Sequence, residues 1–196
     1  MTEWIFMKLI IASNNAHKIY EIKKILGGKF EEIVSLREAE IDHETVEDGT
    51  TFMENAYKKA REIAEISGCA ALADDSGICA DALDGAPGIF SARFSGTHGD
   101  DLANNDLLIA RLADKDDKSA HYTAAICLVY PDGRRVDAEG YLYGSIIDTP
   151  RGERGFGYDP IFVPMGETRT VAEMTDEEKN AISHRGKALA LLLSRL

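Results

Sequence analysis

Short apolar runs alternate with segments of helical periodicity in the first half of the chain. Continuous apolar residues predict buried strands over residues 8–13 and 69–73, and a further strand is predicted over residues 30–36. An amphipathic helix that ends at a Gly-Gly pair follows the first strand. A longer helix over residues 51–66 begins at a Thr-x-x-Glu capping box. Alternation of this kind is typical of α/β structure.

The second half combines helices with strands that follow each other closely. Residues 100–112 have helical periodicity, and a Pro-Asp-Gly turn joins two strand-like runs at residues 121–130 and 134–143. A glycine-rich loop precedes a short strand at residues 161–163, and a second capping box at Thr175 opens the final helix. No repeat or low-complexity linker divides the chain. We therefore predict one mixed α/β domain over residues 1–196, with two lobes and a cleft.

Composition narrows the class of protein. Of the 196 residues, 44% are hydrophobic, which is enough to fill a core. The net charge of -12 argues against sequence-independent nucleic-acid binding, because an acidic surface repels phosphate backbones. No apolar run approaches the ~20 residues that span a bilayer, so no membrane partner is expected. Residues 1–6 lack the features of a secretory signal and are interpreted as a non-core N-terminal extension.

The cysteines support an intracellular interpretation. The chain has 3 of them, an odd number, and none forms a C-x-x-C pair. This pattern argues against a disulfide framework and against a structural zinc site. We therefore expect a soluble cytoplasmic protein.

The first candidate site is the turn after the first strand. A strand that gives way to a helix directs backbone N–H groups and the positive end of the helix dipole at one point, where a phosphate can bind. A lysine in the first helical turn would add a full positive charge. The alternative is an ordinary polar turn with asparagine as N-cap. The residues of this turn are Ser13, Asn14, Asn15, Ala16, His17 and Lys18.

The second candidate site is Asp74-Asp75-Ser76-Gly77, at the end of the predicted strand 69–73. Two carboxylates beside a buried strand are costly unless something neutralises them, and a divalent metal ion is a common partner. The glycine lets the backbone turn sharply. The alternative is a turn with solvated acids.

The last two candidates lie near the C-terminus. In Gly155-Phe156-Gly157-Tyr158-Asp159-Pro160, glycines on each side of Phe156 leave its ring open to a flat ligand such as a nucleobase. The alternative is that its aromatic side chains fill the core. The segment 179–187 contains Arg185, whose five donors match phosphate or base oxygens. The alternative for this segment is a solvated, basic helix start.

Taken in order, these segments resemble the inosine triphosphate pyrophosphatase family. Its T-x-N-x-x-K motif matches residues 13–18 with Ser13 in place of threonine, and its D-D-S-G motif matches residues 74–77. The match continues through residues 47–56, a G-x-P-G motif at 85–88, residues 91–96 and residues 156–159. It ends at Glu178-Lys179 and Ser183-His184-Arg185. Asn14 stands where the family commonly has glycine, and asparagine tolerates positive φ well.

The resemblance implies an elongated mixed α/β sheet with flanking helices and two lobes around a central nucleotide-binding cleft, usually in a homodimer. It implies Mg²⁺-dependent hydrolysis of ITP, dITP and XTP to the monophosphate and pyrophosphate. Asp75 is then the general base and a metal ligand, with Glu47 as the second acidic ligand and Glu44 as the alternative. The implied substrate-binding residues are residues 13–18 together with Ser76, Phe156, Gly157, Tyr158, Asp159, Lys179, His184 and Arg185.

Two other functions remain open at this stage. The septum-inhibitor-like nucleotide pyrophosphatases perform the same α-phosphate chemistry on other bases, although their motifs fit less well. A non-catalytic nucleotide-binding protein is the alternative from a different class. The presence of both Asp74 and Asp75 favours an enzyme.

Overall fold

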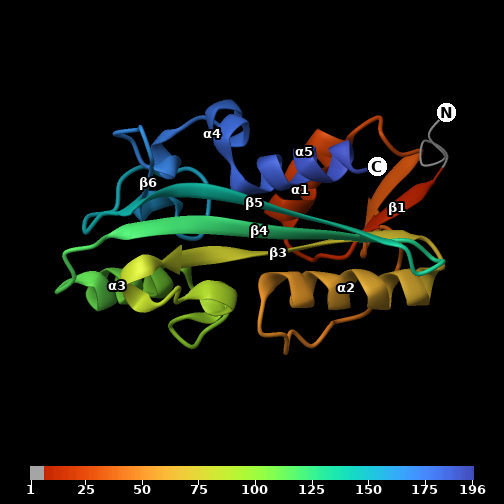
Figure 1. Cartoon of the computed structure of the whole chain (residues 1–196), viewed down its shortest axis with the longest axis horizontal. Coiled ribbons are helices and arrows are strands. Elements are labelled where there is room, and N and C mark those ends of the chain that lie inside the picture. Colours follow the sequence, from red (N-terminus) through yellow and green to blue (C-terminus); the bar gives the residue numbers. More distant parts are fainter. Residues whose placement is uncertain (1–6) are drawn as a thin grey trace. The chain divides into compact units, whose positions relative to one another are not determined.

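The computed structural model describes residues 7–196, and the predicted N-terminal extension lies outside the described part (Figure 1). Short 3₁₀ helices lie in the connections that follow β3. The helices and strands follow one another in the order β1 (Lys8–Ile11), α1 (Ala16–Leu26), β2 (Glu32–Ser35), α2 (Phe52–Ser67), β3 (Ala70–Ala80), α3 (Asp101–Leu112), β4 (Ser119–Val129), β5 (Arg135–Ile146), β6 (Phe162–Pro164), α4 (Asp176–Ile182) and α5 (His184–Ser194).

The strands form one mixed sheet in the order β2-β1-β3-β4-β5-β6. The strand β1 pairs in parallel with both β2 and β3, whereas β5 and β6 are antiparallel. Helices flank the sheet, so the predicted mixed α/β class is confirmed (Figure 1). No helix of residues 7–196 is long and apolar enough to cross a membrane.

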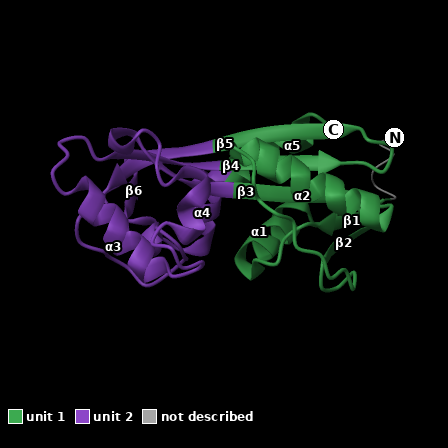
Figure 2. Ribbon diagram, turned by 90° about the horizontal axis from the view of Figure 1, so that it is seen from below, with its two compact units in different colours: residues 1–75, 124–140, 185–196 green, residues 76–123, 141–184 purple. Residues whose placement is uncertain are grey.

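The chain divides into two compact units (Figure 2). Unit 1 comprises residues 1–75, 124–140 and 185–196, and unit 2 comprises residues 76–123 and 141–184. The strands β3, β4 and β5 therefore contribute residues to both units. The prediction of a single domain over the whole chain stays a prediction.

Unit 1 has a core on each face of its strands. Helices α1 and α5 cover one face and α2 covers the other (Figure 1). Alternate residues of β1 explain this arrangement, because Leu9 and Ile11 pack with α1 and α5, whereas Ile10 packs with α2. Apolar side chains on both faces are typical of a strand that is covered on both sides. The continuous apolar run in the sequence is thus the signature of this burial.

Unit 2 has its own core, in which α3 packs against strands and loops. Leu108 and Leu112 of α3 belong to this core, together with Tyr122 of β4 and Phe162 of β6. The rings of Tyr122 and Phe162 meet edge to face with centroids 4.8 Å apart. Such aromatic pairs stabilise a core beyond their buried area.

Local signals located most of the elements correctly. The capping boxes at Thr51 and Thr175 are both formed, and Gly68 ends α2 in the left-handed conformation. Two predictions were wrong. The strand predicted to end at Ala73 continues to Ala80, and the single C-terminal helix is divided into α4 and α5 at Ser183, whose ψ of 146° is extended.

Candidate active site

The turn between β1 and α1 is held by its own polar side chains. The side chain of Asn15, the N-cap of α1, accepts the backbone N–H groups of His17 and Lys18 at 3.0 and 3.1 Å. The hydroxyl of Ser13 accepts the N–H of Asn15 at 3.1 Å. Asn14 is not among the non-glycine residues with positive φ, so this position requires no glycine. The predicted cap is confirmed, and it fixes the conformation of the turn.

Asp74 and Asp75 lie within β3 rather than after its end. Successive side chains of a strand point to opposite faces of the sheet. Leu72 packs with the core of α1 and α5, and Ala73 packs with the core of α2. By the same alternation, Asp74 faces α1 and α5, whereas Asp75 faces α2. The two carboxylates are adjacent in sequence but belong to different surroundings.

The carboxylate of Asp74 is fully buried and paired with two cations. Its Oδ1 lies 2.5 Å from Nζ of Lys18, and its Oδ2 accepts Nε of Arg185 at 3.0 Å. Burial alone would raise the pKa of Asp74, but the charges of Arg185 and Lys18 hold it well below its ordinary value. Asp74 is therefore ionised at neutral pH and holds Lys18 in place.

The guanidinium of Arg185 is buried between two carboxylates. Its side chain is 2% exposed, and its guanidinium binds Asp74 and, through Nη1, the carboxylate of Glu21 on α1. In this structure its charge neutralises two buried carboxylates, and the prediction that Arg185 binds substrate stays a prediction.

Asp75 has a different set of partners, all of which lie in or next to α2. Its Oδ1 accepts Nζ of Lys59 at 2.8 Å, and its Oδ2 accepts Nδ2 of Asn55 at 3.3 Å. The same ammonium of Lys59 lies 3.2 Å from Oε1 of Glu47. Burial raises the pKa of the Asp75 carboxyl, and Lys59 and Lys18 only partly oppose this shift. Because its pKa is raised despite the nearby cations, the Asp75 carboxylate takes up a proton more readily than that of an ordinary aspartate.

Sequence analysis missed Lys59 as a site residue. Its ammonium also donates to the backbone oxygen of Asp74 at 3.1 Å. Burial alone would lower the pKa of Lys59, but Asp75 and Glu47 raise it above its ordinary value. The available signal was its position on α2, directly before the fully buried Ala60. A lysine beside the apolar stripe of a helix needs a buried partner.

The carboxylates of Asp75 and Glu47 fit the chemistry of a Mg²⁺ site. Both are hard oxygen donors, and both approach the same cation, the ammonium of Lys59, within 3.2 Å. No such contact joins Glu44 to Asp75 in the described part of the chain, which favours Glu47 as the second acidic residue. Residues 7–196 contain no cluster of three or more His, Cys, Asp or Glu side chains placed to hold a metal ion.

Unit 2 contains the predicted aromatic loop. Oδ2 of Asp159 accepts the backbone N–H of Phe156 at 3.0 Å and Nζ of Lys179 at 2.8 Å. The Lys179 ammonium lies 4.6 Å from the centroid of the Phe156 ring. The structure thus brings together three residues that the sequence proposed for substrate binding. Because Asp159 is buried, its carboxylate stabilises the loop and is not exposed to solvent.

The two aromatic side chains of this loop differ in their surroundings. The ring of Tyr158 belongs to the core of unit 2 and its hydroxyl donates to the backbone oxygen of Ser91 at 2.8 Å, as the core-filling alternative predicted. Phe156 is outside that core and half-buried. His184 stacks on Tyr122 at 4.8 Å, and the Tyr122 hydroxyl donates to Oδ1 of Asp159 at 3.2 Å. Tyr122 is therefore a second residue that sequence analysis missed.

Gly77 allows a close approach of two segments of unit 2. A Cβ atom at this position would lie 2.3 Å from Oγ of Ser91 and 2.6 Å from the backbone oxygen of Gly88. The change Gly77→Ala is therefore expected to lower the free energy of unfolding by ~1–3 kcal/mol, because the backbone of Gly88 would have to move. Chemical denaturation measures this loss. An unchanged denaturation midpoint would contradict the close packing.

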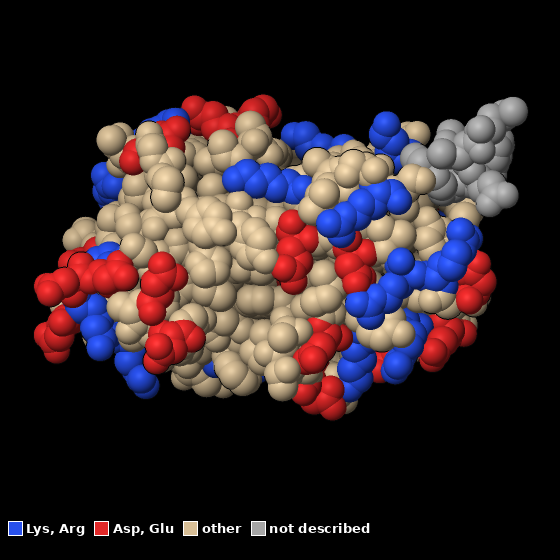
Figure 3. Space-filling view, viewed as in Figure 1, with Lys and Arg blue, Asp and Glu red and all other residues tan. Residues whose placement is uncertain are grey.

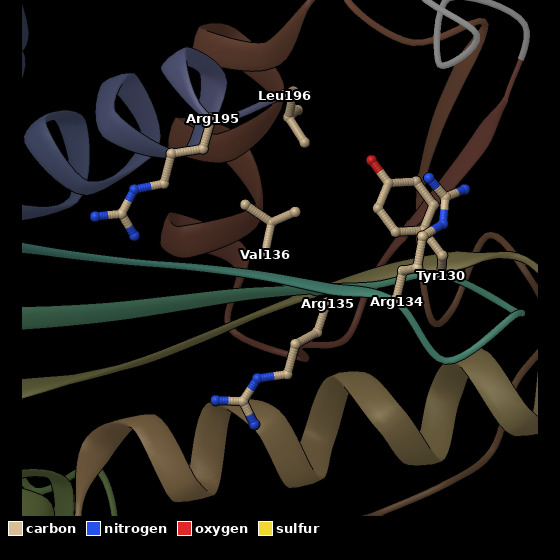
Figure 4. Close-up of a pocket in the computed structure, with 6 residues that line it drawn as sticks. All are labelled: Tyr130, Arg134, Arg135, Val136, Arg195 and Leu196. Carbon is tan, nitrogen blue, oxygen red and sulfur yellow. The ribbon is translucent and has the colours of Figure 1, made fainter.

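A pocket of about 280 Å³ lies elsewhere in unit 1, at the turn between β4 and β5 (Figure 4). Figure 4 shows the guanidinium groups of Arg135 and Arg195 on opposite sides of the sheet, so they do not converge on one ligand. Arg135 binds Asp137 and lies over the ring of Tyr57. The pocket therefore shows no sign of an anion site. Its lining residues are Tyr130, Arg134, Arg135, Val136, Arg195 and Leu196.

The surface charge agrees with the composition. On the face shown in Figure 3, Lys and Arg side chains lie singly or in short groups beside Asp and Glu. The described residues form no continuous basic stripe on that face. A continuous basic stripe is typical of proteins that bind along a nucleic-acid backbone.

Comparisons with known proteins place the chain in a family. The model of the Ham1 family matches residues 9–195. A dITP/XTP pyrophosphatase of Streptomyces coelicolor is 52% identical over 190 residues, which are 95% of each chain. The structure of a nucleoside-triphosphatase, dITP/XTP pyrophosphatase, from Mycobacterium abscessus is 49% identical, with a TM-score of 0.80 and coverage of 95% of this chain and 99% of that one.

A second solved structure supports the same assignment at lower identity. The Ham1 protein of Staphylococcus aureus is 37% identical and has a TM-score of 0.88. The match covers 96% of this chain and 97% of that one. The family resemblance drawn from the motifs is confirmed by these matches, which extend over nearly the whole chain. The chain belongs to the Ham1 family.

Proposed function

We propose that this protein hydrolyses dITP, XTP and ITP to the nucleoside monophosphate and pyrophosphate. The observation that carries the proposal is the pairing of Asp75 and Glu47 around Lys59, because it combines acid groups for hydrolysis with a cation for phosphate. The names of the relatives, dITP/XTP pyrophosphatase, point to the same substrates. The purine-binding loop around Phe156 is consistent with a nucleotide substrate.

The phosphate groups are assigned to cations and backbone amides of unit 1. Lys18 and Lys59 both have side chains that are largely buried, and both are fixed by carboxylates. A fixed cation loses little entropy when it binds an anion, so it binds phosphate better than a mobile surface lysine. The backbone N–H groups at the start of α1 are assigned to the phosphates as well.

Asp75 is assigned as the general base. Its raised pKa makes it a better proton acceptor than an ordinary aspartate, and it is the less strongly neutralised of the two adjacent carboxylates. Asp75 and Glu47 would hold Mg²⁺, which when bound polarises phosphate oxygens and lowers the pKa of bound water. Ser76, which follows Asp75 and is half-buried, is assigned to phosphate or sugar contact.

The purine is assigned to unit 2. The Lys179 ammonium, which offers only hydrogen-bond donors, lies over one face of the Phe156 ring, and the other face is assigned to stacking on the base. Hypoxanthine and xanthine carry an oxygen acceptor at C6, whereas adenine carries an amino donor there. Lys179 and His184 are assigned to this discrimination, and Arg185, next to His184 in sequence, stays among the predicted substrate-binding residues.

Pyrophosphate release from dITP, XTP, ITP, ATP and GTP, each with Mg²⁺ and with excess chelator, tests the proposal. We expect kcat/KM for the first three to exceed that for ATP by roughly 10²-fold or more, since the donors of the site would face an amino group. We expect chelator to abolish turnover, because the triphosphate and the carboxylates repel each other without the cation. Equal use of all five nucleotides would instead indicate a broad pyrophosphatase, and tight binding without turnover a binding protein.

The assembly and the cellular location remain proposals as well. A homodimer is expected from the family resemblance, and analytical ultracentrifugation of the full chain measures it directly. A cytoplasmic location is expected from the composition. Neither bears on the chemistry assigned above.

A further inference from the structure

The N-terminal half of α3 binds both main-chain polar groups of Gly157, the residue that follows Phe156. Oδ2 of Asp101 accepts the N–H of Gly157 at 2.7 Å. Nδ2 of Asn105 donates to the carbonyl oxygen of Gly157 at 3.1 Å. Asp101 and Asn105 are four residues apart, so they lie on the same face of the helix. Together they hold one peptide segment from two sides.

We propose that Asp101 and Asn105 are positioning residues that fix the Phe156 ring for nucleobase stacking. This inference rests on the function proposed above. Gly157 has a φ of +62°, a conformation that glycine leaves readily, so the loop needs external contacts to stay in it. Asp159 anchors the N–H of Phe156, and the pair on α3 anchors the next residue. The peptide on each side of the ring is thereby fixed.

The buried amide of Asn105 supports a functional reason for this pair. Asn105 is 5% exposed, and its Oδ1 has no hydrogen-bond partner among residues 7–196. A buried acceptor without a partner destabilises a fold, so stability alone would favour an apolar residue here. The contact of Nδ2 with Gly157 is what the asparagine adds. Residues that are costly to the fold are common where they arrange a binding site.

The contacts also separate positioning from direct substrate binding. Oδ2 of Asp101 and Nδ2 of Asn105 are occupied by the Gly157 main chain, and Asp101 carries a negative charge that a triphosphate would repel. The groups assigned to hydrolysis belong to unit 1, whereas this pair belongs to unit 2. Their loss should therefore weaken binding of the base and leave the chemical step largely intact.

Steady-state kinetics of Asp101→Ala with dITP test the proposal. We expect KM to rise about 10-fold, as for the loss of a hydrogen bond to a charged group, with kcat changed less than about twofold. The conservative variant Asp101→Asn, which keeps an acceptor, should recover most of the affinity. Asp106→Ala is the matched control, because Asp106 is an exposed aspartate of the same helix. It should leave KM unchanged.

A double-mutant cycle with Phe156→Leu distinguishes positioning from a general structural role. If Asp101 acts through the ring, Asp101→Ala should raise KM in the wild-type background and have no further effect once the ring is absent. The variant Asn105→Leu should raise KM while Tm stays equal or increases, since it removes the unpaired acceptor. A full additional KM effect in the Phe156→Leu background, or a KM near that of the wild type in Asp101→Ala, would overturn the proposal.

Amide exchange gives a test that does not depend on activity. In the protein without nucleotide, Asp101→Ala should accelerate exchange of the Gly157 N–H by roughly 10-fold, whereas Asp106→Ala should not change it. An unchanged exchange rate of the Gly157 N–H would overturn the positioning role of Asp101 even if the enzyme is active. Failure of the wild type to hydrolyse dITP and XTP, with exchange behaving as expected, would reject the proposed function and, with it, the nucleobase as the object of this positioning.

Discussion

Replacing Asp75 with asparagine is expected to lower kcat for dITP by ~10²–10⁴-fold, the usual loss when a general base is removed. Asparagine keeps the size of the side chain but cannot accept a proton. The fold should survive the change. Burial raises the pKa of Asp75, which means that its ionised form is disfavoured in the folded protein, so removal of the charge should not lower Tm. Lys59 would keep Glu47 as a partner.

Asp74→Asn is the matched control for this experiment. The pKa of Asp74 is held low by Arg185 and Lys18, so its ionised form stabilises the fold, and the amide should lower Tm. The expected pattern is loss of turnover with Tm retained for Asp75, and loss of Tm for Asp74. Near-normal kcat in Asp75→Asn would show that Asp75 is structural and direct attention to Glu47.

The pH dependence of the rate provides a second check on Asp75. A general base acts only when it is deprotonated, so kcat/KM should fall as pH decreases through its pKa. Because burial raises that pKa in the metal-free protein, the fall at limiting Mg²⁺ should begin above the range of an ordinary aspartate, whose pKa is about 3.9, and bound Mg²⁺ should move it to lower pH. The Asp75→Asn variant should lack this acid limb. An acid limb unchanged in the variant would assign it to another group.

Arg185→Met is expected to lower the free energy of unfolding by ~3–5 kcal/mol, because it leaves the buried carboxylates of Asp74 and Glu21 without their shared cation. For a chain of this size, such a loss lowers Tm by on the order of 10 °C. Thermal and chemical denaturation measure the effect. If the variant fails to fold, Arg185→Lys, which keeps a charge but not the planar fork, should show a smaller loss.

Arg61→Met is the control for the loss of an arginine as such. Arg61 forms an exposed ion pair with Glu65 at 3.7 Å, and exposed pairs of this kind contribute little to stability.

The Arg185→Met experiment also distinguishes two interpretations of Arg185. A purine-reading arginine would lose discrimination against ATP and keep its Tm. If Tm falls strongly while the folded variant still discriminates against ATP, the result would support the ion-pair role of Arg185.

Much of the site could be predicted from order and spacing along the chain. The turn with Ser13, Asn15 and Lys18 lies at the start of α1, as its asparagine cap predicted. The Phe156 loop contacts Lys179, which is distant in sequence, and the family motifs had already grouped the two. The roles of individual side chains were less predictable. Whether a side chain contacts substrate or fills a core depends on neighbours that the motif does not contain, as the burial of Tyr158 shows.

The sequence by itself determined the positions of most helices and strands, because capping boxes, apolar runs and turns are local features. Only the tertiary structure decided the surroundings of Asp74 and Asp75. A local pattern ends β3 before these acids, since charged residues are costly inside a buried strand. Arg185, more than 100 positions along the chain, and Lys59 on α2 neutralise them, so the strand continues. Charges that are compensated by residues distant in sequence leave no periodic pattern in the sequence. For that reason, the different ion-pair partners of Asp74 and Asp75 can be seen only in the folded chain.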